Sequence, residues 1–145
     1  MSATTETALF ALGNFWEPEY EFGKLRGVVN AESGYTGGTS DNPTYHNIGD
    51  HAEAVHIEFD PHTISYEQLL EKFWSLHDPT AEYENRFRSI IFYLDETQHA
   101  LASESKDMLQ QRREDPIVTE LLPAARFYPA EGYNQHYLAK LRGEL

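Results

Sequence analysis

The chain has 145 residues, of which 40% are hydrophobic and 13% aromatic, and it carries a formal net charge of −13 with no cysteine. This length and composition predict one folded domain spanning residues 1–145. The absence of cysteine excludes disulfides, thiolate metal sites and thiol nucleophiles. The acidic charge argues against nucleic acid or an anionic membrane as a partner.

The start of the chain shows no signal-peptide pattern, because residues 1–7 lack both a basic start and an apolar stretch. No apolar run approaches the roughly 20 residues that a membrane-spanning helix needs. We therefore expect a cytoplasmic protein with no membrane partner.

The first part of the chain alternates between strand and helix patterns. Residues 7–12 form a short apolar run that predicts a buried strand, which ends at Gly13. Residues 15–25 then predict a helix and residues 28–35 a second strand. A loop rich in glycine and other turn-forming residues follows at residues 34–43.

The middle of the chain has clearer local signals. Residues 52–59 alternate between apolar and polar side chains, which predicts a half-buried strand. Ser65 and Gln68 have the spacing of a capping box, and an amphipathic helix follows them. Residues 89–94 predict another strand, and residues 95–113 the longest helix.

The last part of the chain contains two weaker patterns. Residues 118–127 include a strand that Pro123 interrupts, and residues 133–141 predict a short helix. Helices separate most of the strands, while residues 28–35 and 52–59 form strands without a helix between them. This order predicts an α+β fold, a ferredoxin-like two-layer sandwich.

Short motifs follow one another along the chain in the order typical of one family. They are Gly13-Asn-Phe-Trp16, Gly34-Tyr-Thr-Gly-Gly38 with Asn42-Pro-Thr-Tyr45, His51-Ala-Glu53, Phe59-Asp-Pro61, Phe73-Trp74, His77-Asp-Pro-Thr80, Arg88-Ser89 and Phe127-Tyr-Pro-Ala-Glu131. With these motifs the chain resembles peptide methionine sulfoxide reductase A over about residues 7–141. The resemblance implies the two-layer α+β fold of that family.

The resemblance also implies a chemistry. In the family, a cysteine at a helix N-terminus attacks the sulfur of a methionine sulfoxide, and the helix dipole favours its thiolate. A glutamic acid protonates the departing oxygen, tyrosines hydrogen-bond that oxygen, and a Phe-Trp pair encloses the substrate methyl group. Further cysteines or an external thiol then reduce the sulfenic acid. Because this chain has no cysteine, we expect neither thiol-dependent activity nor recycling by thioredoxin.

The nucleophile's position in this chain is Asn14. An amide donates and accepts hydrogen bonds, but it cannot replace a thiolate or form a sulfenic acid. Asparagine is also among the best helix N-caps, and the two interpretations are compatible.

The resemblance assigns roles to other residues around this position. Glu53 matches the family's acid, and strand alternation places it on one face with Val55. If that face is buried, desolvation raises the pKa of Glu53 and suits it to proton donation. We predict a catalytic group of Glu53, Asn14 and Tyr45, and a substrate-binding group of Phe15, Trp16, Tyr45, His51 and Phe87.

The loop at residues 81–87 departs from the family pattern. It is shorter than the family's loop, in which an aspartate and a tyrosine serve the substrate oxygen. Phe87 stands at the tyrosine position and has no hydroxyl, while Glu82 and Glu84 are the nearby carboxylates. Because several features depart together, we interpret Asn14 as natural divergence rather than as an engineered substitution.

The same region contains three side chains of types that bind metal ions. His46, His51 and Glu53 lie close in sequence, as metal ligands do, but the resemblance implies no metal here. No dinucleotide fingerprint is present. We therefore expect no metal and no cofactor, and a small molecule or a peptide as the ligand.

Three functions remain open from the sequence. The first is a repurposed enzyme that performs thiol-independent acid–base chemistry on a small polar, methyl-bearing substrate. The second is a non-catalytic domain that binds methionine sulfoxide or a similar ligand. The third is a relative of the peptide-methionine (S)-S-oxide reductases by sequence alone, without activity of that kind. Glu53 discriminates between the first two, because catalysis needs its carboxyl group and binding tolerates glutamine.

Overall fold

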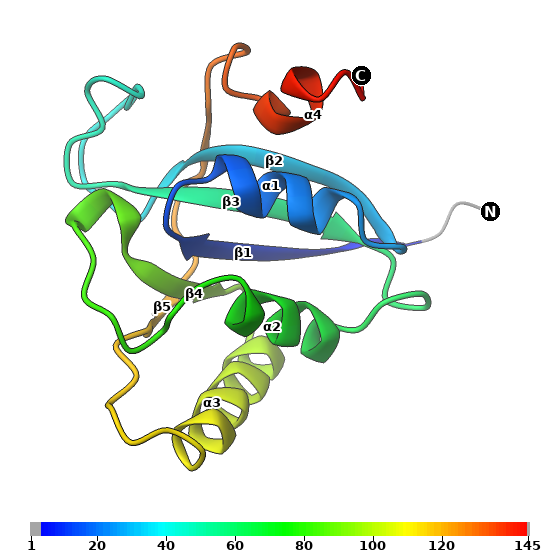
Figure 1. The fold of residues 1–145 in the computed structure, drawn as a ribbon, viewed down its shortest axis with the longest axis vertical. Helices are drawn as coiled ribbons and strands as arrows, with labels where there is room; N and C mark the ends of the chain where they lie inside the picture. The colour runs from blue at the N-terminus through cyan, green and yellow to red at the C-terminus, as the bar shows by residue number, and fades with distance from the viewer. Residues whose placement is uncertain (1–3, 145) are drawn as a thin grey trace.

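The computed structural model describes residues 4–144, which form a six-stranded mixed sheet with helices packed on one side (Figure 1). In chain order the elements are β1 (Glu6–Leu12), α1 (Trp16–Gly23), β2 (Val28–Thr36), β3 (Ala52–Phe59), α2 (Tyr66–Ser75), the 3₁₀ helix η1 (Asn85–Phe87), β4 (Ser89–Tyr93), α3 (Glu96–Gln110), β5 (Glu120–Pro123), β6 (Tyr128–Pro129) and α4 (Tyr137–Leu141).

The strand order confirms the ferredoxin-like arrangement. Across the sheet the order is β5-β4-β1-β3-β2-β6, with β1 antiparallel to both β3 and β4, and β2 antiparallel to β3. The four central strands with α1 and α2 form the β-α-β-β-α-β unit of that fold. The C-terminal part of the chain extends the sheet, because β5 pairs parallel with β4 and β6 pairs antiparallel with β2.

Both faces of the sheet are covered. Successive side chains of a strand point to opposite faces, and the central strands carry apolar residues on both. On the helix side, the core contains Phe10, Phe22, Val55, Ile57, Leu69, Phe73, Ile91 and Ala102. On the opposite face, a second cluster contains Leu9, Ala11, Ala54, Ile90 and Phe92, packed against Leu122 and Phe127 of the C-terminal segment. The α1–α3 helices therefore form one layer, and the C-terminal segment shields the other face.

Two helix starts that local signals predicted are confirmed. Ser65 and Gln68 form the reciprocal capping box at α2, with the Ser65 Oγ accepting from the Gln68 N–H at 3.1 Å. Asp95 caps α3 by accepting from the Gln98 N–H at 2.8 Å. Each cap contributes about 1 kcal/mol to stability.

The structure differs from the predicted elements near the C-terminus. The helix predicted at residues 133–141 is shortened to α4, because His136 has φ 54° and a left-handed backbone interrupts a right-handed helix. The short elements η1 and β6 were not predicted, since three-residue and two-residue segments carry no periodic pattern.

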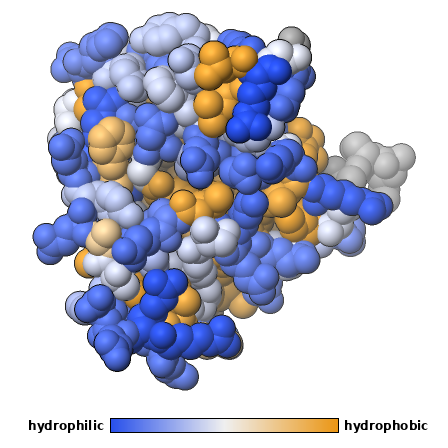
Figure 2. Space-filling model, viewed as in Figure 1, coloured by the Kyte–Doolittle hydropathy of each residue, from blue (hydrophilic) through white to orange (hydrophobic). Residues whose placement is uncertain are grey.

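Within residues 4–144, no helix combines the length and the hydropathy needed to cross a membrane. Figure 2 shows that hydrophilic residues cover most of one face of the molecule, with hydrophobic residues visible in patches between them. The signal-peptide expectation concerned residues 1–7, of which 1–3 lie outside the described residues.

Candidate functional site

The turn between β1 and α1 presents Asn14. Gly13 has φ 95°, which a side chain would strain, and this turn ends β1 and leads into the helix. The Asn14 Oδ1 accepts from the Trp16 N–H at 2.9 Å, so Asn14 caps the start of α1 from one residue before the N-cap position at Phe15. The Asn14 amide nitrogen makes no hydrogen bond within residues 4–144, and it is therefore a free donor at the helix start.

Glu53 lies on β3 with its side chain fully buried at 0% exposure. Its Oε1 accepts from the Phe15 N–H at 3.2 Å, which places the carboxylate directly at the start of α1. Its Oε2 accepts from the Arg86 Nε at 2.7 Å. Burial raises the pKa of Glu53, and the hydrogen bonds from Arg86 and Phe15 oppose this rise.

Arg86, on η1, was not among the predicted site residues. Besides its bond to Glu53, its guanidinium lies over the Tyr45 ring at 4.7 Å and the Phe87 ring at 5.4 Å. Its Nη2 is buried and forms an ion pair with the Glu53 Oε2 at 2.5 Å. One feature of the sequence could have indicated Arg86. A buried carboxylate needs a cationic partner, and Arg86 is the basic residue of the loop at residues 81–87.

Aromatic rings surround the start of α1. The Trp16 and Tyr45 rings are nearly parallel at 6.1 Å and 7°, and the Phe15 ring lies 6.2 Å from that of Tyr45. Tyr137 of α4 stacks on Trp16 at 4.1 Å, and the Trp16 Nε1 donates to Asn134 at 3.1 Å. The C-terminal segment therefore covers part of the indole that the resemblance assigns to the substrate methyl group.

Glu131 is a second residue whose role the sequence did not reveal. It accepts from the Tyr35 hydroxyl at 2.6 Å and from the Tyr45 N–H at 2.9 Å, so it holds the backbone of the loop that carries Tyr45. Desolvation opposes ionisation, but these hydrogen bonds prevail and lower the pKa of Glu131 to about 2. Its motif was recognised in the sequence, but only the fold brings it to Tyr45.

His51 supports the glycine loop instead of facing Asn14. Its Nδ1 accepts from the Gly38 N–H at 3.0 Å, and its Nε2 donates to the Ser40 carbonyl, 2.6 Å away. Both ring nitrogens are thus engaged by loop backbone. Within residues 4–144, no three His, Asp or Glu side chains lie together as a metal site.

The predicted site residues thus divide into two groups. The side chains or backbone of Asn14, Phe15, Trp16, Tyr45, Glu53 and Phe87 lie in one network that Arg86 completes, whereas His51 lies in the neighbouring loop. The network joins the end of β1 to η1 and to the loop between β2 and β3. The roles of these residues in catalysis or binding stay predictions.

Solved structures show the same fold and correct one expectation. The chain matches methionine sulfoxide reductase A of Corynebacterium diphtheriae with a TM-score of 0.82 and 29% identity, over 94% of this chain and 74% of that one. It matches Mxr1 from Saccharomyces cerevisiae in reduced form with a TM-score of 0.88 and 25% identity, over 94% and 85% of the two chains.

A further structure is that of Mxr1 in complex with Trx2, with a TM-score of 0.70 and 23% identity over 94% of this chain and 89% of that one. The expectation that recycling by thioredoxin plays no part is contradicted by that structure, in which a protein of the same fold is in complex with Trx2. The expectation rested on the absence of cysteine alone, whereas docking of a protein partner depends on an extended surface rather than on one residue type.

Sequence comparisons give the family. The chain is 46% identical to peptide methionine sulfoxide reductase MsrA of Pasteurella multocida, over 92% of this chain and 83% of that protein. It is 44% identical to peptide methionine sulfoxide reductase A5 of Oryza sativa subsp. japonica over 96% of its own length, and it spans 58% of the rice protein. The family model described as "Peptide methionine sulfoxide reductase" matches residues 6–144. The chain belongs to the peptide methionine sulfoxide reductase family.

Proposed function

We propose that this protein binds a methyl-bearing sulfoxide, or a chemically similar polar group, at the start of α1 without thiol chemistry. The observation that carries the proposal is the cluster in which the Arg86 guanidinium lies between buried Glu53 and the Tyr45 ring. This cluster keeps donors and aromatic surface together at the position of the family's active site, while Asn14 stands where the family has its nucleophile.

The donors suit the oxygen of a sulfoxide. That oxygen carries a partial negative charge and accepts hydrogen bonds. The Asn14 amide nitrogen makes no hydrogen bond within residues 4–144, and the Arg86 guanidinium, paired with Glu53, supplies positive charge beside it. In this proposal the Arg86 guanidinium takes the role of the family's tyrosine hydroxyl, which is absent because Phe87 stands at that position. Trp16 supplies apolar surface for the methyl group, and Phe15 is buried behind it against the Tyr45 ring.

Entry of a ligand requires movement of side chains. Arg86 lies against Glu53, and Tyr137 lies against the Trp16 ring. Both are on short elements, η1 and α4, which few backbone hydrogen bonds stabilise. We therefore expect the ligand to displace Tyr137 from Trp16 while Arg86 turns its Nη2 toward the ligand oxygen.

A second candidate function is acid–base catalysis on the same ligand class. Burial raises the pKa of Glu53, as a proton donor near neutral pH requires. Against this, both carboxylate oxygens already accept hydrogen bonds, from Phe15 and Arg86. Protonation of Glu53 would leave the half-buried Arg86 guanidinium without its charged partner. We therefore favour binding over acid–base catalysis as the function of this site.

Calorimetric titration separates these functions. The ligands are the two epimers of N-acetyl-methionine sulfoxide amide, with N-acetyl-methionine amide as the control that lacks the oxygen. We expect one sulfoxide epimer to bind more tightly than the thioether. Trp16→Ala should weaken binding by about 1–3 kcal/mol, because a methyl-sized group loses its apolar contact.

Glu53→Gln decides between the two candidates. In a binder this variant keeps most of the affinity, and neither protein changes the ligand chemically. Turnover by the wild type that disappears in Glu53→Gln would establish the acid–base enzyme instead. If no sulfoxide binds to the wild type or to either variant, the proposal is wrong.

A further inference from the structure

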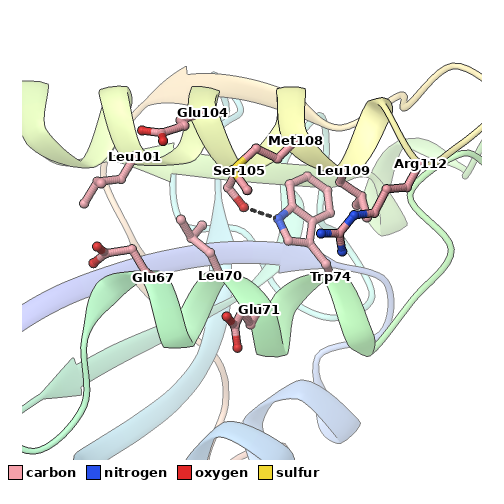
Figure 3. A pocket seen from close by; sticks show the side chains of 10 residues that line it. All are labelled: Glu67, Leu70, Glu71, Trp74, Leu101, Glu104, Ser105, Met108, Leu109 and Arg112. Atoms are coloured by element: carbon pink, nitrogen blue, oxygen red, sulfur yellow. Dashed lines mark hydrogen bonds between the residues drawn. The ribbon is translucent and has the colours of Figure 1, made fainter.

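A cavity of about 450 Å³ lies between α2 and α3, and none of the residues that line it belongs to the network around Asn14 (Figure 3). This volume lies within the range of small-molecule sites, roughly 300–1,000 Å³. The Trp74 Nε1 donates to the Ser105 Oγ at 2.7 Å, which joins the two helices across the cavity. The cavity therefore has a fixed indole as part of its wall.

The cavity is apolar where the two helices face each other. Figure 3 shows side chains of both helices directed into the space between them, and the apolar ones are Leu70, Trp74, Leu101, Met108 and Leu109. Met108 is 53% exposed, although burial of its thioether side chain would be favourable. The helix pair thus leaves apolar surface that a ligand can cover.

Three carboxylates line the same cavity: Glu67 and Glu71 on α2, and Glu104 on α3. All three are exposed, and none has an ion-pair partner among the described residues. Glu67 and Glu71 are one helical turn apart, where like charges repel and destabilise a helix. A cation beside Glu67 would relieve this repulsion.

The cavity's one basic lining residue lies at its other end. In Figure 3, Glu67 and Glu104 are near one end of the two helices and Arg112 is near the opposite end. Lys72 follows Glu71 in the sequence, but it forms its ion pair with Glu21 at 3.2 Å. The charge on the cavity is therefore negative at the end that carries Glu67 and Glu104.

We propose that the α2–α3 cavity binds an organic cation with an apolar body, such as a primary or quaternary ammonium attached to an aromatic or alkyl group. The apolar body lies against Met108 and the leucines, and the ammonium lies at Glu67 and Glu104. The Trp74 indole, which lies toward the Arg112 end in Figure 3, adds apolar surface for the body of the ligand. This site is independent of the sulfoxide site proposed at the start of α1.

The test uses the full chain and the probe 2-phenylethylammonium at pH 7. The chain has two tryptophans, so ¹H–¹⁵N spectra contain two indole N–H signals, and Trp16→Phe identifies the signal of Trp74. We expect a saturable shift of the Trp74 signal. The neutral analogue 2-phenylethanol should bind about tenfold more weakly, and the anion 3-phenylpropanoate should not bind, because Coulomb attraction changes sign.

Exposed lining residues provide variants that leave the fold intact. Glu67→Gln and Glu104→Gln should each weaken binding of the probe about threefold, as expected for exposed charge pairs. Arg112→Gln is the matched control, because it also removes one exposed charge but of the opposite sign, and it should leave the affinity unchanged or increase it.

Three results would overturn the proposal. The first is equal affinity for the ammonium and the alcohol. The second is an unchanged affinity in both glutamine variants. The third is a shift of the Trp74 signal with protein concentration alone, because a second copy of the chain would then occupy the cavity.

Discussion

The pair of Arg86 and Glu53 makes a strong prediction about stability. Arg86→Met removes the guanidinium and keeps most of the side-chain volume, so Glu53 remains at 0% exposure with only the Phe15 N–H beside it. Breaking a buried ion pair from one side costs about 3–5 kcal/mol. The Arg86 side chain is 25% exposed, which places the expected loss near the lower limit, at about 3 kcal/mol.

The same substitution should change how stability depends on pH. Without Arg86, the pKa of Glu53 in the folded protein rises further above its ordinary value of 4.5. Between these two values the folded state binds the proton and the unfolded state does not, so stability falls as the pH rises above about 4.5. Below that pH the variant should approach the wild type.

The measurement is urea unfolding of the wild type and the variants at several pH values from 4 to 8. Arg88→Met is the matched control, because Arg88 pairs with exposed Glu120 at 3.4 Å, and its loss should cost less than about 1 kcal/mol. Adding Glu53→Gln to Arg86→Met should recover about half or more of the lost stability, since no buried charge remains. Equal losses for both arginine variants, with no pH dependence, would refute the reasoning.

Three further outcomes are expected. Incubation of the wild type with methionine sulfoxide and dithiothreitol should yield no methionine above the uncatalysed rate, as measured by chromatography. Asn14→Cys alone should recover little activity. Efficient turnover by the wild type would contradict this expectation. Glu131→Gln should lower stability by about 2 kcal/mol near neutral pH, because the charge-assisted bond from Tyr35 is lost. In the wild type this contribution is present above the ordinary pKa of 4.5 and disappears as the pH falls toward about 2, so a variant with unchanged acid unfolding would count against it. Tyr137→Ala should expose the Trp16 indole and shift its fluorescence to longer wavelength, and an unchanged spectrum would mean that the two rings are not stacked in solution.

Local patterns were sufficient for most of the fold. The alternation at residues 52–59 predicted β3 with its bounds, and the spacing of Ser65 and Gln68 predicted the start of α2. These signals succeed because hydrogen-bonded caps and strand faces involve residues within a few positions of each other. The helix at residues 133–141 was predicted too long, since nothing in a helical pattern reveals the left-handed backbone of His136.

The sequence by itself also determined the family, through the order of its motifs, and the absence of a thiol, through its composition. Only the tertiary structure decided which side chains meet at the start of α1. Arg86 and Glu53 are 33 positions apart, and Tyr35 and Glu131 are 96 positions apart. Such pairs depend on which strands and loops the sheet order brings together, and a local period of two or 3.6 residues carries no information about partners at that separation. Burial of Glu53 creates the need for a cation, but the fold alone places Arg86 where it meets that need.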